Sequence, residues 1–142
     1  MDPLVVSGVL DSLGAIGRYV LDAASAAGLD KRASYRLRLA VDEIATNAVI
    51  HGYQEAGLEG MLTVRAEMDE GALTIILEDM AASFDPRQIP LPDTLDLPLD
   101  ERPIGGLGVY LTLQGVDDFR YERVDDRNRN IFVVRRPQNQ KA

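Results

Sequence analysis

The order of hydrophobic patterns along this chain constrains its fold more than any other feature. Apolar side chains recur at helical spacing over residues 8–27 and again over 31–52. After these two ranges, short β-rich runs separated by polar turns take over, at 61–68, 73–77, 119–124 and 130–135. Helices gathered in the first half and strands in the second predict an α+β fold. We expect a two-layer sandwich with the helices packed on one face of a mixed, mostly antiparallel sheet.

Turn and cap residues set the expected limits of these elements. Gly28 ends the first helix, and Asp30 is the predicted N-cap of the second, which then runs to Gly52. Asp69-Glu70-Gly71 predicts a hairpin between the first two long strands. The polar run Asp125-Asp126-Arg127-Asn128 is predicted to be the turn between the last two strands. A short edge strand is expected at residues 4–6.

Length and composition limit the class of protein. A chain of 142 residues suits a single domain over 1–142, and it contains no cysteine for disulfides or thiolate metal sites. No apolar stretch reaches the length of a membrane span, and the N-terminus lacks the pattern of a signal peptide. These features predict a cytoplasmic protein.

The net charge of the chain is acidic, at −8. Nucleic acids and anionic membranes both attract basic proteins, so neither is an expected partner. The lysines are Lys31 and Lys141, and no phosphate-binding G-x-x-x-x-G-K-[ST] sequence occurs. If the protein handles phosphates, backbone N–H groups, a metal ion and arginine must do so.

Three polar residues at four-residue steps mark the second helix. Glu43, Asn47 and His51 lie along one stripe if the helix is regular. A carboxylate can accept a proton, and an amide oxygen can bind a hard cation such as Mg²⁺. The alternative is a solvated helix face. Two observations weaken this alternative. The stripe borders the apolar face, where polar groups need partners, and Asn47 is a mediocre helix former.

A second candidate segment follows the strand predicted at 73–77. It reads Glu78-Asp79-Met80-Ala81-Ala82-Ser83-Phe84-Asp85. A carboxylate at a strand end can accept a hydrogen bond from the exocyclic amine of adenine. An ordinary turn with solvated acids is the alternative.

The third candidate is a glycine cluster after a long loop. Residues 86–103 hold five of the seven prolines, and long loops in compact domains are often functional. Gly105-Gly106-Leu107-Gly108 then precedes a helix expected over 109–115. Glycines allow close backbone approach, and a helix N-terminus presents free N–H groups to an anion. A simple turn is the alternative for this short motif.

In this order the three segments resemble the histidine-kinase-like ATPase superfamily, also called the Bergerat fold. The likeness is greatest to bacterial anti-sigma-factor serine kinases. Residues 39–53 are similar to that family's N-box, 79–86 to its adenine-binding D-x-G-x-x-F-D-P segment, and 104–111 to its glycine box. The resemblance covers about residues 24–136.

The resemblance implies a role for each matching residue. Glu43 would be the catalytic base, and Asn47 would ligate Mg²⁺. Asp79 would bind the adenine amine, in a segment that also contains Ala81 and Phe84. The implied phosphate contacts come from the glycine segment and the arginine before it: Arg102, Gly105, Gly106, Leu107 and Gly108. The proline-rich loop would be a lid, and His51 is expected to brace the helix rather than to react.

Two departures from the family pattern stand out. Ala81 occupies the position of a motif glycine, where a methyl group could crowd the base or oppose a positive φ. The expected lid also carries acids, which do not favour phosphates unless Mg²⁺ intervenes: Asp93, Asp96, Asp100 and Glu101.

The resemblance implies a serine/threonine protein kinase that uses ATP and Mg²⁺. Its substrate would be a small antagonist protein, and its second partner a sigma factor, in a partner-switching system. One alternative is a binding module of the same fold without transfer activity. Ala81 supports this alternative, whereas Glu43 and Asn47 oppose it. The other is the ATPase domain of a two-component histidine kinase. Homodimer formation stays open.

Overall fold

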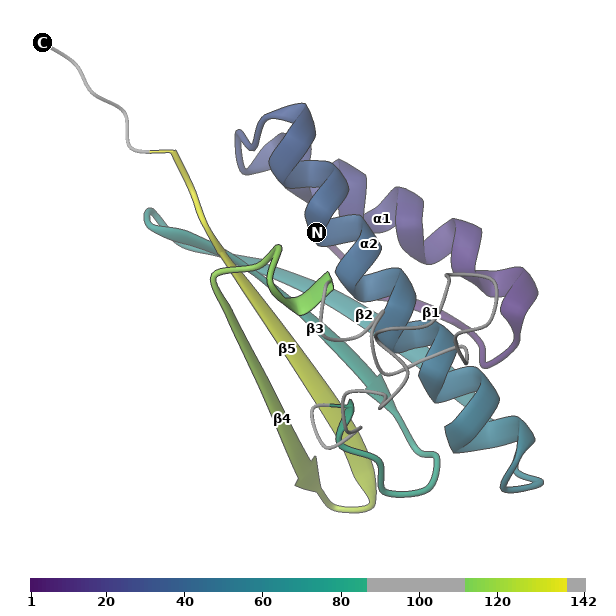
Figure 1. Ribbon diagram of the computed structural model, residues 1–142. Helices are drawn as coiled ribbons and strands as arrows, with labels where there is room; N and C mark the ends of the chain where they lie inside the picture. The colour runs from purple at the N-terminus through teal and green to yellow at the C-terminus, as the bar shows by residue number, and fades with distance from the viewer. Residues whose placement is uncertain (87–111, 138–142) are drawn as a thin grey trace, which may run out of the picture.

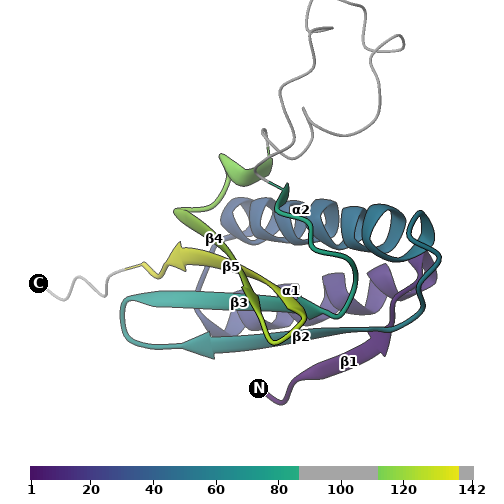
Figure 2. The ribbon, with the colours of Figure 1, turned by 90° about the horizontal axis from the view of Figure 1, so that it is seen from below.

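The computed structural model describes residues 1–86 and 112–137, which form two layers (Figure 1). One layer is a five-stranded sheet in the order β1-β2-β3-β5-β4. Its strands are β1 (Leu4–Ser7), β2 (Met61–Met68), β3 (Ala72–Asp79), β4 (Asp118–Val124) and β5 (Arg127–Arg135). Two helices make the second layer, and Figure 2 shows both of them on the same side of the sheet.

The predicted α+β sandwich is confirmed, with one correction to the sheet. Every pair among the described strands is antiparallel, so the sheet is not mixed. Short turns join β2 to β3 and β4 to β5, and a short connection between neighbouring strands makes them antiparallel. The hairpin predicted at Asp69 is present, where the carboxylate accepts from the amides of Gly71 and Ala72, both at 2.8 Å.

The first helix begins later than its hydrophobic pattern predicted. A 3-10 turn, η1 (Leu10–Ser12), precedes α1 (Leu13–Ala26). The helix does not start at Gly8, because Val9 has an extended backbone, with φ at −129° and ψ at 157°. The Gly8 amide donates to the carbonyl of Gly60 at 2.8 Å, at the sheet edge. Gly28 has a φ of +80°, which is the left-handed conformation that ends many helices.

The second helix is α2 (Lys31–Asn47), and it changes its winding where it meets the end of the sheet. Its N-cap is Asp30, as predicted, and the carboxylate accepts from the amide of Ala33 at 2.8 Å. From Ala48 to Gln54 the chain forms a π-helical segment, η2, with the amide of Glu55 donating to the carbonyl of Ile50 at 2.9 Å. The prediction of one regular helix to Gly52 is therefore wrong after Asn47.

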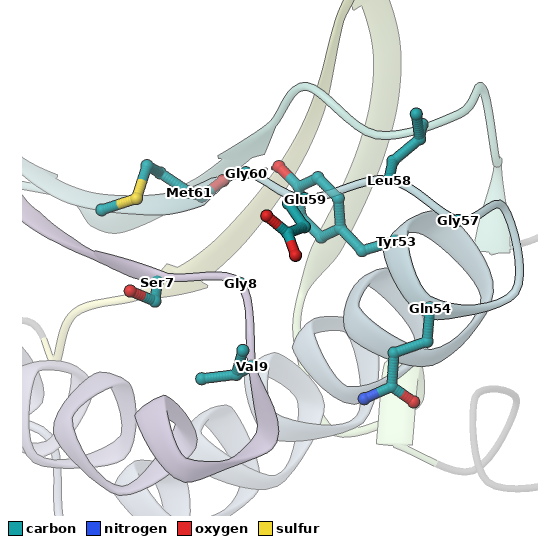
Figure 3. A pocket seen from close by; sticks show the side chains of 10 residues that line it. All are labelled: Ser7, Gly8, Val9, Tyr53, Gln54, Gly57, Leu58, Glu59, Gly60 and Met61. Atoms are coloured by element: carbon teal, nitrogen blue, oxygen red, sulfur yellow. Dashed lines mark hydrogen bonds between the residues drawn. The ribbon is translucent and has the colours of Figure 1, made fainter.

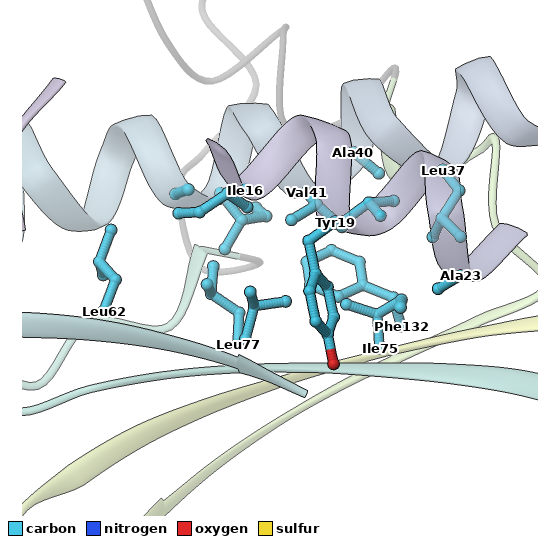
Figure 4. Packing of buried hydrophobic residues seen from close by; sticks show 14 of the residues in the cluster. Ile16, Tyr19, Ala23, Leu37, Ala40, Val41, Leu62, Ile75, Leu77 and Phe132 are labelled. Atoms are coloured by element: carbon cyan, nitrogen blue, oxygen red, sulfur yellow. The ribbon is translucent and has the colours of Figure 1, made fainter. Parts of the chain in front are cut away.

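The hydrophobic core lies between the two layers (Figure 4). The sheet contributes alternate residues of its three central strands, and the helices contribute one stripe each. Fully buried members include Ile16, Val20, Leu37, Val41, Ile44, Leu62, Leu73, Ile75, Leu77 and Phe132. Tyr19 of α1 adds a polar contact, because its hydroxyl oxygen accepts from the amide of Ala66 at 3.1 Å, beyond the end of β1. This hydrogen bond satisfies the amide of Ala66, which has no partner in β1 because β1 is too short.

The last hairpin is tighter than predicted. Asp125 and Asp126 alone form its turn, with φ values of 49° and 64°. Two consecutive left-handed residues suit the right-handed twist of a hairpin. β5 therefore begins at Arg127, and Asn128 is a strand residue rather than a turn residue as the sequence suggested.

Several expectations concern parts of the chain outside the described residues. Most of the proline-rich loop and the first residues of the helix expected at 109–115 are among them. Residues 112–113 are helical, and the amide of Gly115 closes a turn onto the carbonyl of Thr112 at 3.0 Å. Within 1–86 and 112–137, no helix has the length and apolar character to span a membrane.

Gly52 allows the closest approach between the helical layer and the segment after β3. A Cβ atom at this position would lie 2.8 Å from the Cβ of Ala81, whereas a Cβ at Gly14 would meet nothing within 4 Å. We expect Gly52→Ala to lower the free energy of unfolding by about 1–3 kcal/mol through overpacking. Gly14→Ala should raise it by up to about 1 kcal/mol, because alanine favours helix. Chemical denaturation measures both.

A double variant checks the cause of this loss. Gly52→Ala combined with Ala81→Gly should recover part of the stability, because the second change removes the atom that clashes. Strict additivity of the two single effects would show that the Gly52–Ala81 approach is not the reason.

Candidate functional site

The helix-facing side of the sheet becomes polar where β3 ends. Asp79 is the last residue of β3 and lies opposite Asn128 of β5, while Asn130 lies opposite Leu77. All three polar side chains are at least 95% buried. Leu77 and Asp79 occupy the same face of β3, so the polar group continues directly from the hydrophobic core. Buried polar side chains in a row need partners or a ligand.

Asp79 is held by two hydrogen bonds to one of its oxygens. The side-chain Nδ2 of Asn128 donates to Oδ1 at 2.8 Å, and the amide of Ala81 donates to the same atom at 3.0 Å. Burial raises the pKa of the Asp79 carboxyl above its ordinary value, and the bonds from Asn128 and Ala81, with the charge of Arg123, partly oppose that rise. None of the hydrogen bonds between described residues uses Oδ2.

The polar stripe of α2 carries two of the predicted site residues. Glu43 and Asn47 lie one turn apart in a regular helix, as predicted. The carboxylate of Glu43 is partly exposed and has no hydrogen-bond or ion-pair partner within 1–86 and 112–137. Asn47 is buried, and its Nδ2 has no partner among the described residues. An unpaired buried amide is costly, which is a reason to expect a ligand beside it.

Asp42, the neighbour of Glu43, belongs to a different surface of α2. Its carboxylate lies 3.5 Å from Nε of Arg38, and the same Nε lies close against Gly17 of α1. Burial raises the pKa of Asp42, and Arg38 partly opposes the rise. Asp42 therefore lies on the side of α2 that meets α1, away from Glu43.

A small cavity lies between α2 with η2 and the polar end of the sheet. Its volume is about 10 Å³, which is room for roughly one water molecule. It is lined by Ile44, Ala48, Gly52, Asp79, Ala82, Phe84, Pro86, Asn128 and Asn130. A purine base needs far more space, so a base could bind here only if some of these side chains move.

Ala81 occupies the motif glycine position without backbone strain. In the described part of the chain, the non-glycine residues with positive φ are Asp125 and Asp126, so Ala81 is not among them. Its methyl group belongs to the hydrophobic core and faces Gly52, and the side chain is not part of the cavity lining. The concern about a forced positive φ at Ala81 therefore does not apply in this structure.

His51 makes contacts that brace the helical segment against the chain after β3. Its ring stacks on Phe84 with centroids 5.8 Å apart, and its Nδ1 lies 2.9 Å from Oε2 of Glu55. His51 lies in the π-helical segment η2, so it does not continue the regular stripe of Glu43 and Asn47. Its position connects η2 to one wall of the cavity, which Phe84 lines.

A larger hollow of about 770 Å³ lies elsewhere, between the end of β1 and the connection from η2 to β2 (Figure 3). It contains none of the predicted site residues, and its one ionisable carboxylate is Glu59. Tyr53 connects this hollow to the chain that follows Asp79. The Tyr53 ring lines this hollow, while its hydroxyl donates to the carbonyl of Met61 at 2.7 Å and accepts from the amide of Met80 at 3.0 Å. The larger hollow is the weaker candidate site, because its lining offers one carboxylate and none of the predicted site residues.

The structure thus brings together part of the predicted site and adds to it. Asp79 and Phe84 share the small cavity, and Glu43 and Asn47 lie on the helix that covers it. Asn128 and Asn130 were missed, although the alternation in Arg127-Asn128-Arg129-Asn130 is a strand signal with one polar face inward. Outside the described residues lie Arg102, Gly105, Gly106, Leu107 and Gly108.

Comparison with known proteins agrees with the fold. Residues 6–134 match the sequence model of the histidine kinase-like ATPase domain. Among solved structures, the histidine kinase domain of a blue-light activated histidine kinase from Erythrobacter litoralis matches with a TM-score of 0.52. That match covers 86% of this chain and 60% of the other, at 21% identity, so it shows a common fold.

Among curated proteins, the similar sequences are serine-protein kinases named RsbW. The protein from Bacillus pumilus is 38% identical over 86 residues, which is 58% of this chain and 53% of the relative. The protein from Bacillus subtilis is 37% identical over 89 residues, or 61% of this chain and 55% of the relative. The chain therefore spans about half the length of the curated relatives it matches.

The raised pKa of Asp79 predicts how stability depends on pH. The folded protein binds this proton more tightly than the unfolded chain does, so ionising Asp79 lowers the free energy of unfolding. As the pH rises above about 3.8, wild type should lose stability relative to Asp79→Asn, until the folded-state pKa is passed. The amide oxygen of asparagine can still accept the bonds from Asn128 and Ala81.

Denaturation curves of both proteins between pH 3 and pH 7 measure this difference. Parallel stability profiles across that range would contradict a raised pKa at Asp79.

Proposed function

Because this chain belongs to the histidine kinase-like ATPase family, we propose that it is an ATP-dependent serine/threonine protein kinase of the anti-sigma-factor type. Its substrate would be a small antagonist protein with a target serine or threonine, and a sigma factor would be the second partner, in the cytoplasm. The similarity to serine-protein kinases from two Bacillus species supports this choice within the family.

The observation that carries the proposal is the buried carboxylate of Asp79 at the end of β3. It faces a cavity beneath the helix that bears Glu43 and Asn47, with Oδ1 occupied by protein donors. A carboxylate held in this way presents its second oxygen as a charged acceptor, which suits the amine of adenine. Guanine carries a carbonyl oxygen at the equivalent ring position and would be repelled.

The stripe on α2 supplies what phosphoryl transfer requires from side chains. Glu43 would take the proton of the acceptor hydroxyl as its oxygen forms a bond to the γ-phosphorus. The bond from that phosphorus to the β–γ bridging oxygen breaks, and ADP leaves with the electron pair. The partly exposed carboxylate of Glu43 is accessible to a second protein in a way that buried Asp79 is not.

The residues present fit a magnesium ion that arrives with the nucleotide. Among the described residues there is no cluster of three or more histidine or acidic side chains that could hold a metal alone. Asn47 would offer its amide oxygen to the ion, and its unpartnered Nδ2 could donate to a phosphate oxygen of the same nucleotide. Mg²⁺ commonly takes one or two protein oxygens and otherwise phosphate oxygens and water, where it neutralises charge on the phosphates.

The rival interpretations are weaker. Ala81 was the argument for an inert module, but in the structure it has no positive φ and its side chain is absent from the cavity lining. The solved histidine kinase domain shares the fold at 21% identity, which does not favour the same reaction. The curated relatives are serine-protein kinases.

Nucleotide selectivity tests the role of Asp79. Wild type should bind Mg-ATP more tightly than Mg-GTP in calorimetry. Asp79→Asn should lose most of that preference, because an amide is a poorer acceptor and its NH₂ group repels the adenine amine. Asp69→Asn is a control, since Asp69 is exposed in the β2–β3 hairpin. Equal affinity of wild type for both nucleotides would contradict the assignment of Asp79.

Transfer activity tests Glu43 separately from binding. Glu43→Gln keeps the shape of the side chain and removes the base, so phosphorylation of an antagonist protein should fall by roughly 10²–10⁴-fold. Nucleotide affinity should change little. Glu55→Gln is the matched control, because Glu55 is an exposed acid on the following segment. Unchanged phosphorylation by Glu43→Gln would rule out Glu43 as the base.

A further inference from the structure

Among the described residues at the polar end of the sheet, Asn128 makes the most side-chain hydrogen bonds. It lies directly opposite Asp79 in the pairing of β3 with β5, and it is 98% buried. Its Nδ2 donates to Asp79 Oδ1 at 2.8 Å, to the carbonyl of Ala82 at 2.9 Å and, more weakly, to the carbonyl of Ala81 at 3.4 Å. One amide thus connects the strand end to the chain that follows it.

The carbonyl of the same side chain is also fully engaged. Asn128 Oδ1 accepts a short hydrogen bond from the hydroxyl of Tyr121, a bond from Arg123 at 3.1 Å and a longer one from the amide of Phe84 at 3.4 Å. Acceptors surround Nδ2 and donors surround Oδ1, which fixes which end of the amide is nitrogen and which is oxygen. The side chain therefore has one orientation, with its NH₂ group toward Asp79.

Its neighbour Asn130 provides a contrast within the same strand. Asn130 faces the same cavity and is equally buried, but its Oδ1 has no partner among the described residues. Burial and residue type are the same at the two positions, so the difference lies in the hydrogen bonds of the Asn128 side chain, among them the bond to Asp79.

We propose that Asn128 is a positioning residue for nucleotide binding, which holds Oδ1 of Asp79 and the segment 81–84 in place so that Oδ2 faces the adenine amine. This inference rests on the proposed function. Asn128 itself need not touch the base.

The need for space in the cavity agrees with this role. A base can enter only if part of the lining moves, and Asn128 is tied by hydrogen bonds through both ends of its amide. Phe84 and Ala82 are at least partly exposed and lie on the segment after β3, so moving them costs fewer buried contacts than moving Asn128. The contrary view is that the Asn128 amide occupies the place of the adenine amine and must be displaced. The two views predict opposite effects when the side chain is removed.

Nucleotide binding by Asn128→Ala separates these views. We expect Asn128→Ala to weaken Mg-ATP binding by about tenfold, as loss of a hydrogen bond to a charged group can do, and to reduce the preference for ATP over GTP. Tighter ATP binding by Asn128→Ala would overturn the proposal, and so would an unchanged preference for ATP over GTP.

A measurement without nucleotide separates this inference from the proposed function. Loss of the Asn128 bond should raise the titration midpoint of Asp79 in carbon-13 carboxyl NMR, while Asn130→Ala leaves it unchanged. Among the described residues, the other ionisable groups that act on Asp79 are Arg123 and Tyr53, and both variants retain them. An unchanged midpoint in Asn128→Ala would overturn the inference alone. Wild type that binds no nucleotide would overturn the proposed function.

If Asn128→Ala does not fold, Tyr121→Phe gives a second test. It removes the hydroxyl that donates to Asn128 Oδ1 and leaves the bond from Asn128 to Asp79 in place. A looser Asn128 should produce the same changes in selectivity and titration midpoint at smaller size. Wild-type values for both quantities in Tyr121→Phe would overturn the proposal.

Discussion

The packing of α2 across the inner face of the sheet is the constraint on which the rest of this structure depends. One side of α2 completes the hydrophobic core through Leu37, Val41 and Ile44. The adjacent polar stripe is thereby carried to the end of β3, where the sheet itself becomes polar. Core and candidate site are thus two parts of one interface, and a change in the helix position would disturb both.

The close approach of η2 to the chain after β3 has a physical basis in small side chains. Gly52 has no Cβ, and Ala81 fills the space that this leaves. The π-helical winding of η2 occurs at this same contact, and π segments are frequent at functional sites. Stacking of His51 on Phe84 adds a second contact between η2 and the cavity wall.

Removing the Asp79 carboxylate from water costs free energy, and the surrounding residues reduce that cost. A carboxylate removed from water favours its protonated form, while Asn128, the amide of Ala81 and Arg123 favour the ionised form. This balance limits the rise in the pKa of Asp79, in a pocket where the interactions of a carboxylate are stronger than in water. The same arrangement lowers stability, which is common where a site is prepared for a ligand.

Local patterns in the sequence were sufficient to predict the types of the elements, the edge strand, the N-cap at Asp30, the stripe of Glu43 and Asn47, and the placement of Asp79 at a strand end. Such features depend on residues within a few positions of one another, so periodicity and capping preferences reveal them. The hairpin turn at Asp125 was placed correctly, but its length was overestimated because four polar residues in a row conceal where pairing resumes.

Only the tertiary structure decided which distant residues meet. Asn128 contacts Asp79 across 49 positions of sequence, and that contact follows from the register of β5 on β3. The packing of the Ala81 methyl group in the core, against Gly52 of the helical layer, likewise follows from tertiary structure. Neither register nor interlayer packing is encoded in a local pattern, because each depends on how two separate elements fit together. For this protein, the sequence determined the chemical groups available to the site, and the fold determined which of them touch.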